Sequence, residues 1–298
     1  HQNRMSGKDG KAMDKIQQNL LQEVAGIHDV PQGAYSLRIN GSLYGKNSSE
    51  HITINKKEDK PGIDIIIKPD TKNESVHIPV LLSQTGLKEL VYNDFYVGED
   101  CDVTIVAGCG IHNGGDQTAE HSGIHSFYVS KNAKVKYIEK HYGEGDGNGK
   151  NVMNPTTYVE LGENSHMEME TAQIKGVDST ERKTHAILSK NATITIHEKI
   201  MTHGSQHAQT EFSVELNGED YLARLGGGRC RMTWIAPDGT VLYDTGADAA
   251  QMENHLDREE VREALDTGGG SSSRYSVTLL QKTVYCARRL ADGTVLRL

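Results

Sequence analysis

The residues of this sequence that could do chemistry gather in one stretch, from Ala107 to Gly145. Within it lie five side chains of metal-binding types: Cys109, His112, His121, His125 and His141. Thiolate and imidazole suit zinc, copper and iron, so the stretch predicts a metal or metal-cluster site. The spacing is not that of a zinc finger, because no second pair of ligands follows at a regular distance. Since fourteen histidines are spread over the chain, a structural role for this group is the alternative.

Length and composition limit what this stretch can belong to. A chain of 298 residues can bury one large core or two smaller ones. Its net charge of -9 argues against a nucleic-acid partner. The sequence has no apolar run long enough to cross a membrane and no signal-peptide core near its start. Four scattered cysteines do not make a disulfide framework, so we expect a cytoplasmic protein. The start at His1 and the end within a predicted strand are typical of a fragment.

The composition changes sharply near Glu219 to Leu222. Residues 1–220 contain nineteen lysines and three arginines, whereas residues 221–298 contain one lysine and nine arginines. Isoleucine falls from nineteen to one across the same point, and asparagine falls from fifteen to one. Folding does not require such a change, because Lys and Arg are nearly equivalent on a solvated surface. The sequence therefore predicts two domains, residues 1–220 and 221–298, and suggests the hypothesis of a chimeric join between two partial genes.

The elements that would position the chemical stretch are repeats. After an amphipathic helix expected over residues 13–27, four units share the order strand, polar corner, strand. They begin at Phe95 (FYVGEDCDVTI), Phe127 (FYVSKNAKVKY), Tyr158 (YVELGENSHMEM) and His185 (HAILSKNATITI). Their small corner residues lie 32, 32 and 27 residues apart: Cys101, Ala133, Ser165 and Ala192. Stacked units without intervening helices predict a β-solenoid, with a β-sandwich of irregular hairpins as the alternative.

Several motifs in the first domain resemble the SufB/SufD family in its compact form. They include YNDFYVGEDCDVTIVAGCGIHN, EHSGIHSFYV, IEKHYGEGDGNGKNVMNP and METAQIKGVDSTERKT, and they cover residues 13–218. The resemblance implies a mainly β protein, a right-handed parallel β-helix with a short N-terminal helix. It also implies a non-catalytic scaffold of the Suf machinery, which assembles iron-sulfur clusters. Its expected partners are a SufC-type ATP-binding-cassette ATPase and a second SufB/SufD-like subunit, which includes the case of a homodimer.

The resemblance also implies which side chains take part in cluster chemistry. The candidates for holding a transient iron-sulfur cluster or its metal match family motif positions: Cys109, His112, His121, His125, Glu139 and His141. Cys109 and His112 are the expected metal-binding pair, and Lys140 and Arg182 are expected to balance negative charge. In a solenoid, side chains about one coil apart in sequence can touch. A solvated surface position is the alternative for Lys140, and a packing role is favoured for Cys101.

The second domain departs from the family. A SufB/SufD protein continues past TEFSVELNGED into further coils and helices that dock the ATPase, and here a different sequence follows. It predicts two strands joined by a turn at Asp238 and Gly239, a helix beginning near Met252, a loop at TGGGSSS, and strands with a turn at Asp292 and Gly293. We therefore expect the solenoid to be truncated.

Residues 224–298 resemble the extracytoplasmic PAS-like sensor domain of bacterial membrane histidine kinases, a small α+β module. The alternative function is thus a sensor or ligand-binding fragment of such a kinase. Three arginines could contact an anionic ligand there, or could simply be solvated: Arg274, Arg288 and Arg289. An enzyme is the third class. Because no paired acids and no nucleophile motif stand out, the sequence argues against it.

Overall fold

The computed structural model describes residues 12–216, 231–276 and 281–298. The chain forms two compact units, residues 1–216 and 217–298. The proposed chimeric join at Glu219 to Leu222 lies outside the described residues. Among the described residues, no helix has the length and apolar character needed to cross a membrane.

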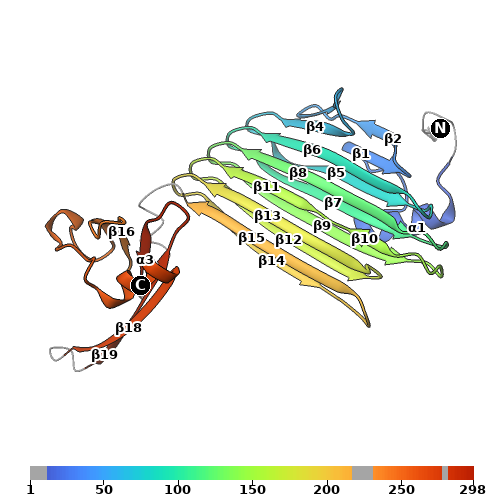
Figure 1. Cartoon of the computed structure of the whole chain (residues 1–298). Coiled ribbons are helices and arrows are strands. Elements are labelled where there is room, and N and C mark those ends of the chain that lie inside the picture. Colours follow the sequence, from blue (N-terminus) through green and yellow to red (C-terminus); the bar gives the residue numbers. More distant parts are fainter. Residues whose placement is uncertain (1–11, 217–230, 277–280) are drawn as a thin grey trace. The chain divides into compact units, whose positions relative to one another are not determined.

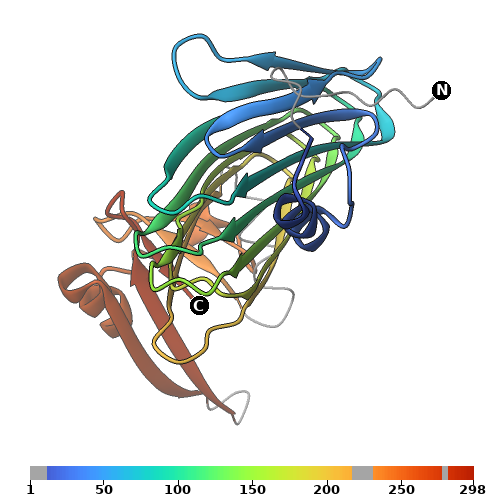
Figure 2. The same cartoon turned by 90° about the vertical axis from the view of Figure 1, so that its right-hand side faces the viewer.

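The first unit is a parallel β-helix built from two facing sheets, as the repeats predict (Figures 1 and 2). The order in sheet A is β14 (Thr193–Ile200), β12 (His166–Lys175), β9 (Lys134–Glu144), β7 (Asp102–His112), β5 (Lys72–Leu82), β1 (Ala34–Ile39) and β2 (Ser42–Asn47). The order in sheet B is β10 (Asn151–Met153), β13 (Ser179–Leu188), β11 (Thr156–Leu161), β8 (Ala119–Val129), β6 (Lys88–Val97), β4 (Gly62–Ile67) and β3 (Ile52–Lys56). A further strand, β15 (His207–Leu216), pairs with β13, and β10 also pairs with β8. From β4 to β15 the chain passes back and forth between the two sheets, with the consecutive strands β10 and β11 both in sheet B, so each coil stacks on the one before it.

The corners between the sheets follow the predicted design. At each corner one polar residue adopts a left-handed backbone conformation, with φ between 57° and 60°: Asp100, Asn132, Asn164 and Asn191. Their side chains are hydrogen-bonded to one another from coil to coil, at 3.1, 3.3 and 3.0 Å. Asn and Asp tolerate this conformation better than other non-glycine residues. The predicted small corner residues are all buried behind this ladder: Cys101, Ala133, Ser165 and Ala192.

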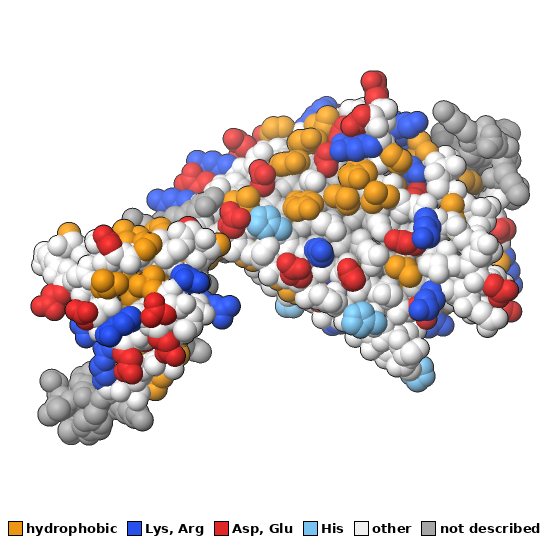
Figure 3. All heavy atoms as spheres, in the orientation of Figure 1, with side chains coloured by type: hydrophobic (Ala, Val, Ile, Leu, Met, Phe, Trp, Pro, Cys, Tyr) orange, Lys and Arg blue, Asp and Glu red, His pale blue; other side chains and the backbone are white. Residues whose placement is uncertain are grey.

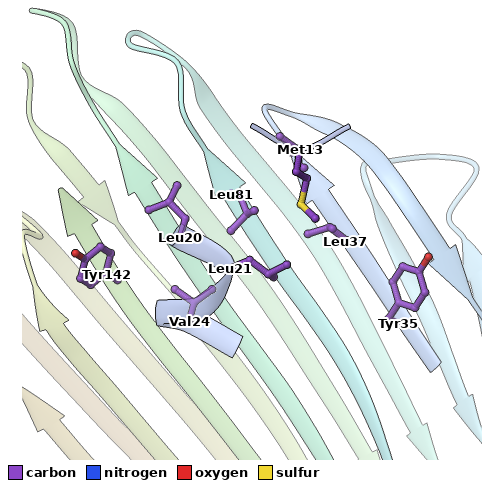
Figure 4. Close-up of a cluster of buried hydrophobic side chains, with 9 residues drawn as sticks. Met13, Leu20, Leu21, Val24, Tyr35, Leu37, Leu81 and Tyr142 are labelled. Atoms are coloured by element: carbon purple, nitrogen blue, oxygen red, sulfur yellow. The ribbon is translucent and has the colours of Figure 1, made fainter. Parts of the chain in front are cut away.

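The helix α1 (Lys15–Ala25) covers part of the outer face of sheet A (Figures 2 and 4). Asp14 and Gln17 form a capping box at its start, and Gly26 ends it in a left-handed conformation. Its apolar face buries Leu20, Leu21 and Val24 against β5, β7 and β9. Two glycines of β7 permit this close packing, because a Cβ atom at Gly108 would lie 2.9 Å from Val24 Cβ and one at Gly110 would lie 3.1 Å from Leu20 Cβ.

The last coil of the first unit is open. Within the described residues, β14 and β15 have no strand on their outer edges. Phe212 and Val214 have the parity of inward-facing residues, since they pair with Thr184 and Ala186 of β13. They are nevertheless 47% and 45% exposed. In the part of the chain that the structure describes, the edge strands and these apolar side chains therefore form an end without a cap, the kind of surface that pairs with other strands.

The second unit is a five-stranded antiparallel sheet with one described α-helix. The strand order is β17 (Val241–Asp244), β16 (Thr233–Ile235), β20 (Val295–Arg297), β19 (Gln281–Arg289) and β18 (Gly269–Ser276). The helix α3 (Glu259–Thr267) contacts β18, β19 and β20. Its Val261 and Ala264 pack with apolar residues of the sheet. The predicted turns at Asp238–Gly239 and Asp292–Gly293 are present, and each glycine has a φ of 85°. The α+β composition of this unit agrees with the sequence, while its PAS-like identity stays a prediction.

Two details of the second unit were predicted wrongly. The helix does not begin near Met252, where a short 3-10 helix, η1 (Ala249–Gln251), ends instead. Asn254 breaks the pattern by accepting a hydrogen bond from Leu256 N and donating one to Asp238 O. TGGGSSS is not a loop, because β18 begins at Gly269. Gly270 has a packing role, since a Cβ atom there would lie 2.2 Å from Glu260 O of α3.

Candidate functional site

The pairing register brings most of the sequence-predicted site residues together inside the solenoid. Cys109 of β7 pairs with His141 of β9, one coil later in the chain. On the facing sheet, His121 pairs with Glu89, and His125 pairs with Asn93. Side chains alternate between the two faces of a strand, so each pair stacks on the inner face. These stacks form one polar layer in the interior.

A small cavity of about 10 Å³ lies in this layer. Its lining comes from both sheets: Ile78, Val80, Gly108, Cys109, His121, Gly123, His125, Glu139, His141 and Pro155. The cavity is close to the smallest volume that holds one water molecule. Its polar side chains are buried, and none of the five functional candidates in it is more than 7% exposed. The site is thus preformed but suits only a very small ligand.

Buried ion pairs hold the carboxylate of this layer in place. Arg182 Nη2 of β13 donates to Glu139 Oε2 at 2.6 Å, and its Nε donates to Glu198 Oε1 of β14 at 2.7 Å. Burial alone would raise the pKa of Glu139, but the charge of Arg182 and contacts with His141 hold that pKa well below its usual range. Because burial lowers the pKa of His141 and keeps that ring neutral, Arg182 is the compensating charge. Thr210 Oγ1 of β15 donates to Glu198 Oε2 at 2.7 Å and continues the network to the last coil.

Two of the imidazoles are held neutral by burial. Loss of hydration lowers the pKa of His125 to about 4 and also lowers the pKa of His141. The side chain of His125 is fixed by Tyr137, whose Oη lies 2.8 Å from His125 Nδ1 and donates to Glu139 Oε1 at 3.0 Å. His141 Nδ1 lies 3.1 Å from Arg182 Nη1. A neutral imidazole carries an electron pair on one ring nitrogen, and this is the form that binds metal ions.

The third imidazole belongs to a second ion pair. Arg38 Nε of β1 donates to Glu89 Oε1 at 2.6 Å. The other carboxylate oxygen, Glu89 Oε2, is 3.7 Å from His121 Nδ1, and each of these atoms lacks a hydrogen-bond partner among the described residues. Burial raises the pKa of Glu89, but His121 and Arg38 lower it more, so this carboxyl group is ionised. Unpartnered polar atoms in a buried site indicate room for a water molecule or a ligand.

Cys109 lies in the same layer as a neutral thiol. Burial raises its pKa well above the ordinary value, and the nearby Glu89 and Glu139 carboxylates raise it further. A thiol of this kind is a poor nucleophile on its own. A bound metal ion would reverse this preference, because a coordinating thiol is deprotonated. The arrangement therefore favours binding of a cation over covalent catalysis.

His112 and Lys140 do not join this layer. Cys109 and His112 are three residues apart on β7 and so face opposite sides of the sheet. On the outer face, His112 Nδ1 lies 3.2 Å from Glu144 Oε1. Lys140 has the outward parity of its strand, opposite to Glu139 and His141, and is only half-buried. Cys109 and His112 therefore cannot bind one ion together while β7 keeps this conformation.

Sequence reasoning missed five members of the layer: Arg38, Glu89, Asn93, Tyr137 and Glu198. A signal for Glu89 was present, because it precedes His121 by 32 residues, which is the coil length given by the corner residues. Alternation along β9 likewise places Tyr137 on the same face as Glu139 and His141. The contacts made by Arg38 and Arg182 cross from one sheet to the other, and strand periodicity carries no such information.

Other surface features lie outside this layer. On the outer face of sheet B, five apolar side chains are 38% to 48% exposed, and hydrophobic side chains gather there in Figure 3: Ile66, Leu90, Tyr96, Tyr128 and Tyr158. The rings of Tyr96 and Tyr128 stack with their centroids 5.1 Å apart. In the second unit, an open pocket of about 510 Å³ is lined partly by Arg288 and Arg289. Arg274 is bound instead to Glu260 Oε2, at 2.6 Å.

Comparison with known proteins adds no assignment. Neither a scan against protein-family models nor a search of curated proteins found a match to the chain. Within the described ranges, no three His, Cys, Asp or Glu side chains are already arranged to ligate one metal ion. The interior layer nevertheless supplies thiol, imidazole and carboxylate donors at short range, which are the groups that bind iron and zinc.

Proposed function

We propose that residues 13–218 are a SufB/SufD-like scaffold on which iron-sulfur clusters or their components are assembled. The observation that supports this best is the interior layer itself. Five of the six candidates that the resemblance implies line one cavity: Cys109, His121, His125, Glu139 and His141. Arg182, implied as a charge-balancing residue, is bonded to Glu139 and lies beside His141. Six residues chosen from sequence motifs would not be expected to meet in a fold that did not use them.

The chemistry needed for such a scaffold is binding and release, not turnover. Iron is cargo in this proposal, and the protein contributes soft donors together with carboxylates that balance its charge. The two buried ion pairs fix the donors without occupying Cys109, since both arginines bond to carboxylates. No catalytic step by the chain is required, and ATP hydrolysis would be supplied by a SufC-type partner.

The open last coil supports the proposed second subunit. Its unpaired edges and the exposed Phe212 and Val214 suit association with another solenoid, which includes a second copy of this chain. Substitution of Phe212 by Asp would place a charge in that interface. We expect the variant to fold, because Phe212 is already 47% exposed, and to sediment as a monomer at concentrations at which the wild-type chain is dimeric.

Two experiments test the scaffold. The first is co-purification of the full chain with a SufC-type ATPase. The second is anaerobic reconstitution with iron and sulfide, which should give a charge-transfer absorbance that Cys109→Ala removes and Cys101→Ala retains. Cys101 is the matched control, because it is equally buried but lies at a corner, where its Sγ contacts Lys68 O. If neither the ATPase binds nor the absorbance develops, the proposal is wrong.

A second candidate function concerns the second unit. A sensor or ligand-binding fragment is favoured by its antiparallel sheet and by the open pocket beside Arg288 and Arg289. Arg289 Nη1 donates to Leu265 O, so Arg288 is the better candidate to contact an anion. Titration of the full chain with dicarboxylates, compared with Arg288→Gln, tests this function. Binding that Arg288→Gln weakens would support it, and the absence of binding would remove it.

A further inference from the structure

The interior layer contains a gap on strand β8, where the sequence reads His-Ser-Gly-Ile-His. His121, Gly123 and His125 share the inner face because they are two residues apart. Gly123 has no side chain, and the imidazole rings of His121 and His125 border the space that this leaves. A Cβ atom added to Gly123 would lie 3.1 Å from His125 Nε2 and 3.5 Å from His121 Nε2. The same atom of both rings therefore faces the gap.

Hydrogen bonds determine the tautomer of His125. Tyr137 Oη donates its only proton to Glu139 Oε1, so it must accept from His125 Nδ1 at 2.8 Å. Nδ1 thus carries the proton, and Nε2 carries the electron pair. Nε2 is only weakly engaged, with Asn93 Nδ2 3.4 Å away. The chain from His125 through Tyr137 to Glu139 is a carboxylate-supported imidazole, an arrangement typical of metal-binding histidines.

His121 is oriented in the same way by a different carboxylate. Its Nδ1 faces the ionised Glu89 Oε2 at 3.7 Å, and that carboxyl group is anchored by Arg38. A proton on Nδ1 is favoured beside this negative charge, which again leaves the electron pair on Nε2. His141 differs, because its Nδ1 accepts from Arg182 Nη1 and its electron pair is already used. Two imidazoles of the three are therefore free to bind.

The net charge of the layer favours binding of a cation over binding of an anion. Two arginines and three glutamates carry one net negative charge: Arg38, Arg182, Glu89, Glu139 and Glu198. The guanidinium groups of both arginines bond to carboxylates, so the layer offers an anion little, and the atoms facing the gap are electron-pair donors. Cys109 lines the same cavity and would add a thiolate on losing its proton. A divalent ion together with that thiolate would leave the layer neutral.

We propose that the gap over Gly123 is a binding site for a single divalent transition-metal ion, ligated by Nε2 of His121 and His125 and by the Cys109 sulfur. Metal-nitrogen bonds are about 2.0 to 2.1 Å long, so both rings must move toward an ion that enters the gap. The cavity of about 10 Å³ accommodates a single ion as it stands, and a cluster would require the cavity to widen. The site deepens the proposed function, since it would be where assembly takes up its metal, but ion binding itself requires neither sulfide nor the ATPase.

The test is anaerobic titration of the full-length, metal-free chain with cobalt(II), which gives d-d bands and a thiolate charge-transfer band. We expect one cobalt per chain from the band intensities and equilibrium dialysis. Gly123→Ala keeps every ligand but places a methyl group in the gap, and it should weaken binding at least tenfold, as should His125→Gln. His112→Gln alters an outer-face histidine of the same stretch and should bind like the wild type. Far-UV circular dichroism of each variant verifies that the β-helix is retained.

The outcomes separate this site from the proposed function. Unchanged cobalt affinity in folded Gly123→Ala and His125→Gln would overturn the site, and so would loss of binding in His112→Gln. If Gly123→Ala does not fold, His121→Gln replaces it, with the same expected loss. One cobalt per chain without cluster reconstitution or ATPase co-purification would instead uphold the site and refute the scaffold.

Discussion

Replacement of Arg182 by methionine tests whether this arginine compensates the buried charge of Glu139. In the wild-type chain, Arg182 and Glu139 are 7% and 4% exposed, and their charged atoms lie 2.6 Å apart. Methionine resembles the arginine stem in length but brings no charge, so Glu139 would remain as a buried carboxylate without its guanidinium partner. Removal of one partner from a buried ion pair costs about 3 to 5 kcal/mol. We expect Arg182→Met to lower the unfolding free energy of the first unit by that amount at pH 7.

The destabilisation caused by Arg182→Met should depend on pH. Since the pKa of Glu139 is depressed in the folded wild type, the pair stabilises the fold above the ordinary carboxyl pKa of 4.5 and loses that effect as the pH falls through the folded pKa. In Arg182→Met, burial would raise the Glu139 pKa instead. Protonation of Glu139 then removes the unpaired charge, so the difference in unfolding free energy between the variant and the wild type should shrink as the pH falls. Glu139→Gln combined with Arg182→Met should recover much of the loss at pH 7.

The assay is denaturant unfolding of the full chain followed by far-UV circular dichroism. Trp234, the single tryptophan, lies in the second unit, so its fluorescence provides an internal control that we expect to stay unchanged. Lys136→Met is the matched surface control, because the pair of Lys136 with Glu170 is 2.9 Å long but about 40% exposed and should contribute little. A loss below about 1 kcal/mol in Arg182→Met, with no pH dependence, would refute the view that this ion pair compensates a buried charge.

Three further predictions concern single residues. The buried His125 has a folded pKa of about 4, against an ordinary value of 6.5, so its contribution to the unfolding free energy should fall by at most about 3 kcal/mol as the pH drops from 6.5 to 4. His125→Gln should flatten this part of the pH profile of unfolding. An unchanged profile would contradict the view that His125 is buried in its neutral form. Asn164 has a φ of 58°, so Asn164→Ala should lower the unfolding free energy by about 1 to 2 kcal/mol. Asn164→Gly should lower it by less, because glycine adopts this backbone conformation easily. Equal losses in the two variants would show that the hydrogen bonds of the side-chain ladder matter more than the backbone conformation. Iodoacetamide should label the exposed Cys286 quickly and the buried Cys109 only after unfolding, as mass spectrometry of timed samples would reveal; rapid labelling of Cys109 in folded protein would exclude a neutral, buried thiol.

The solenoid could be predicted because its repeats are written directly in the sequence. The spacing of the corner residues Cys101, Ala133 and Ser165 equals the length of one coil, and pairs such as Cys109 with His141 are separated by the same 32 residues. A coil length combined with strand alternation is enough to place a residue on the inner or outer face. Applied to β7, that rule would have assigned His112 to the outer face.

Contacts between the two sheets could not be predicted in this way. Arg182 reaches Glu139 across the interior from a strand 43 residues away, and the distance between the facing layers depends on the packing of every side chain between them. The second unit shows a related limit. TGGGSSS has the composition of a loop. Its glycines nevertheless allow α3 to approach β18, so tertiary packing outweighs the local preference of this segment for a loop.

The position of α1 affects the order in which the chain folds as it is made. Residues 15–25 leave the ribosome before β7 and β9, yet these two strands, which end at residues 112 and 144, form part of the surface that buries Leu20 and Val24. An isolated helix of 11 residues is only marginally stable in water. More than a hundred further residues must therefore be synthesised before this helix gains its full packing. During that interval Gly108 and Gly110 leave a bare strip on the growing sheet, where a chaperone or a neighbouring nascent chain could bind in place of the helix.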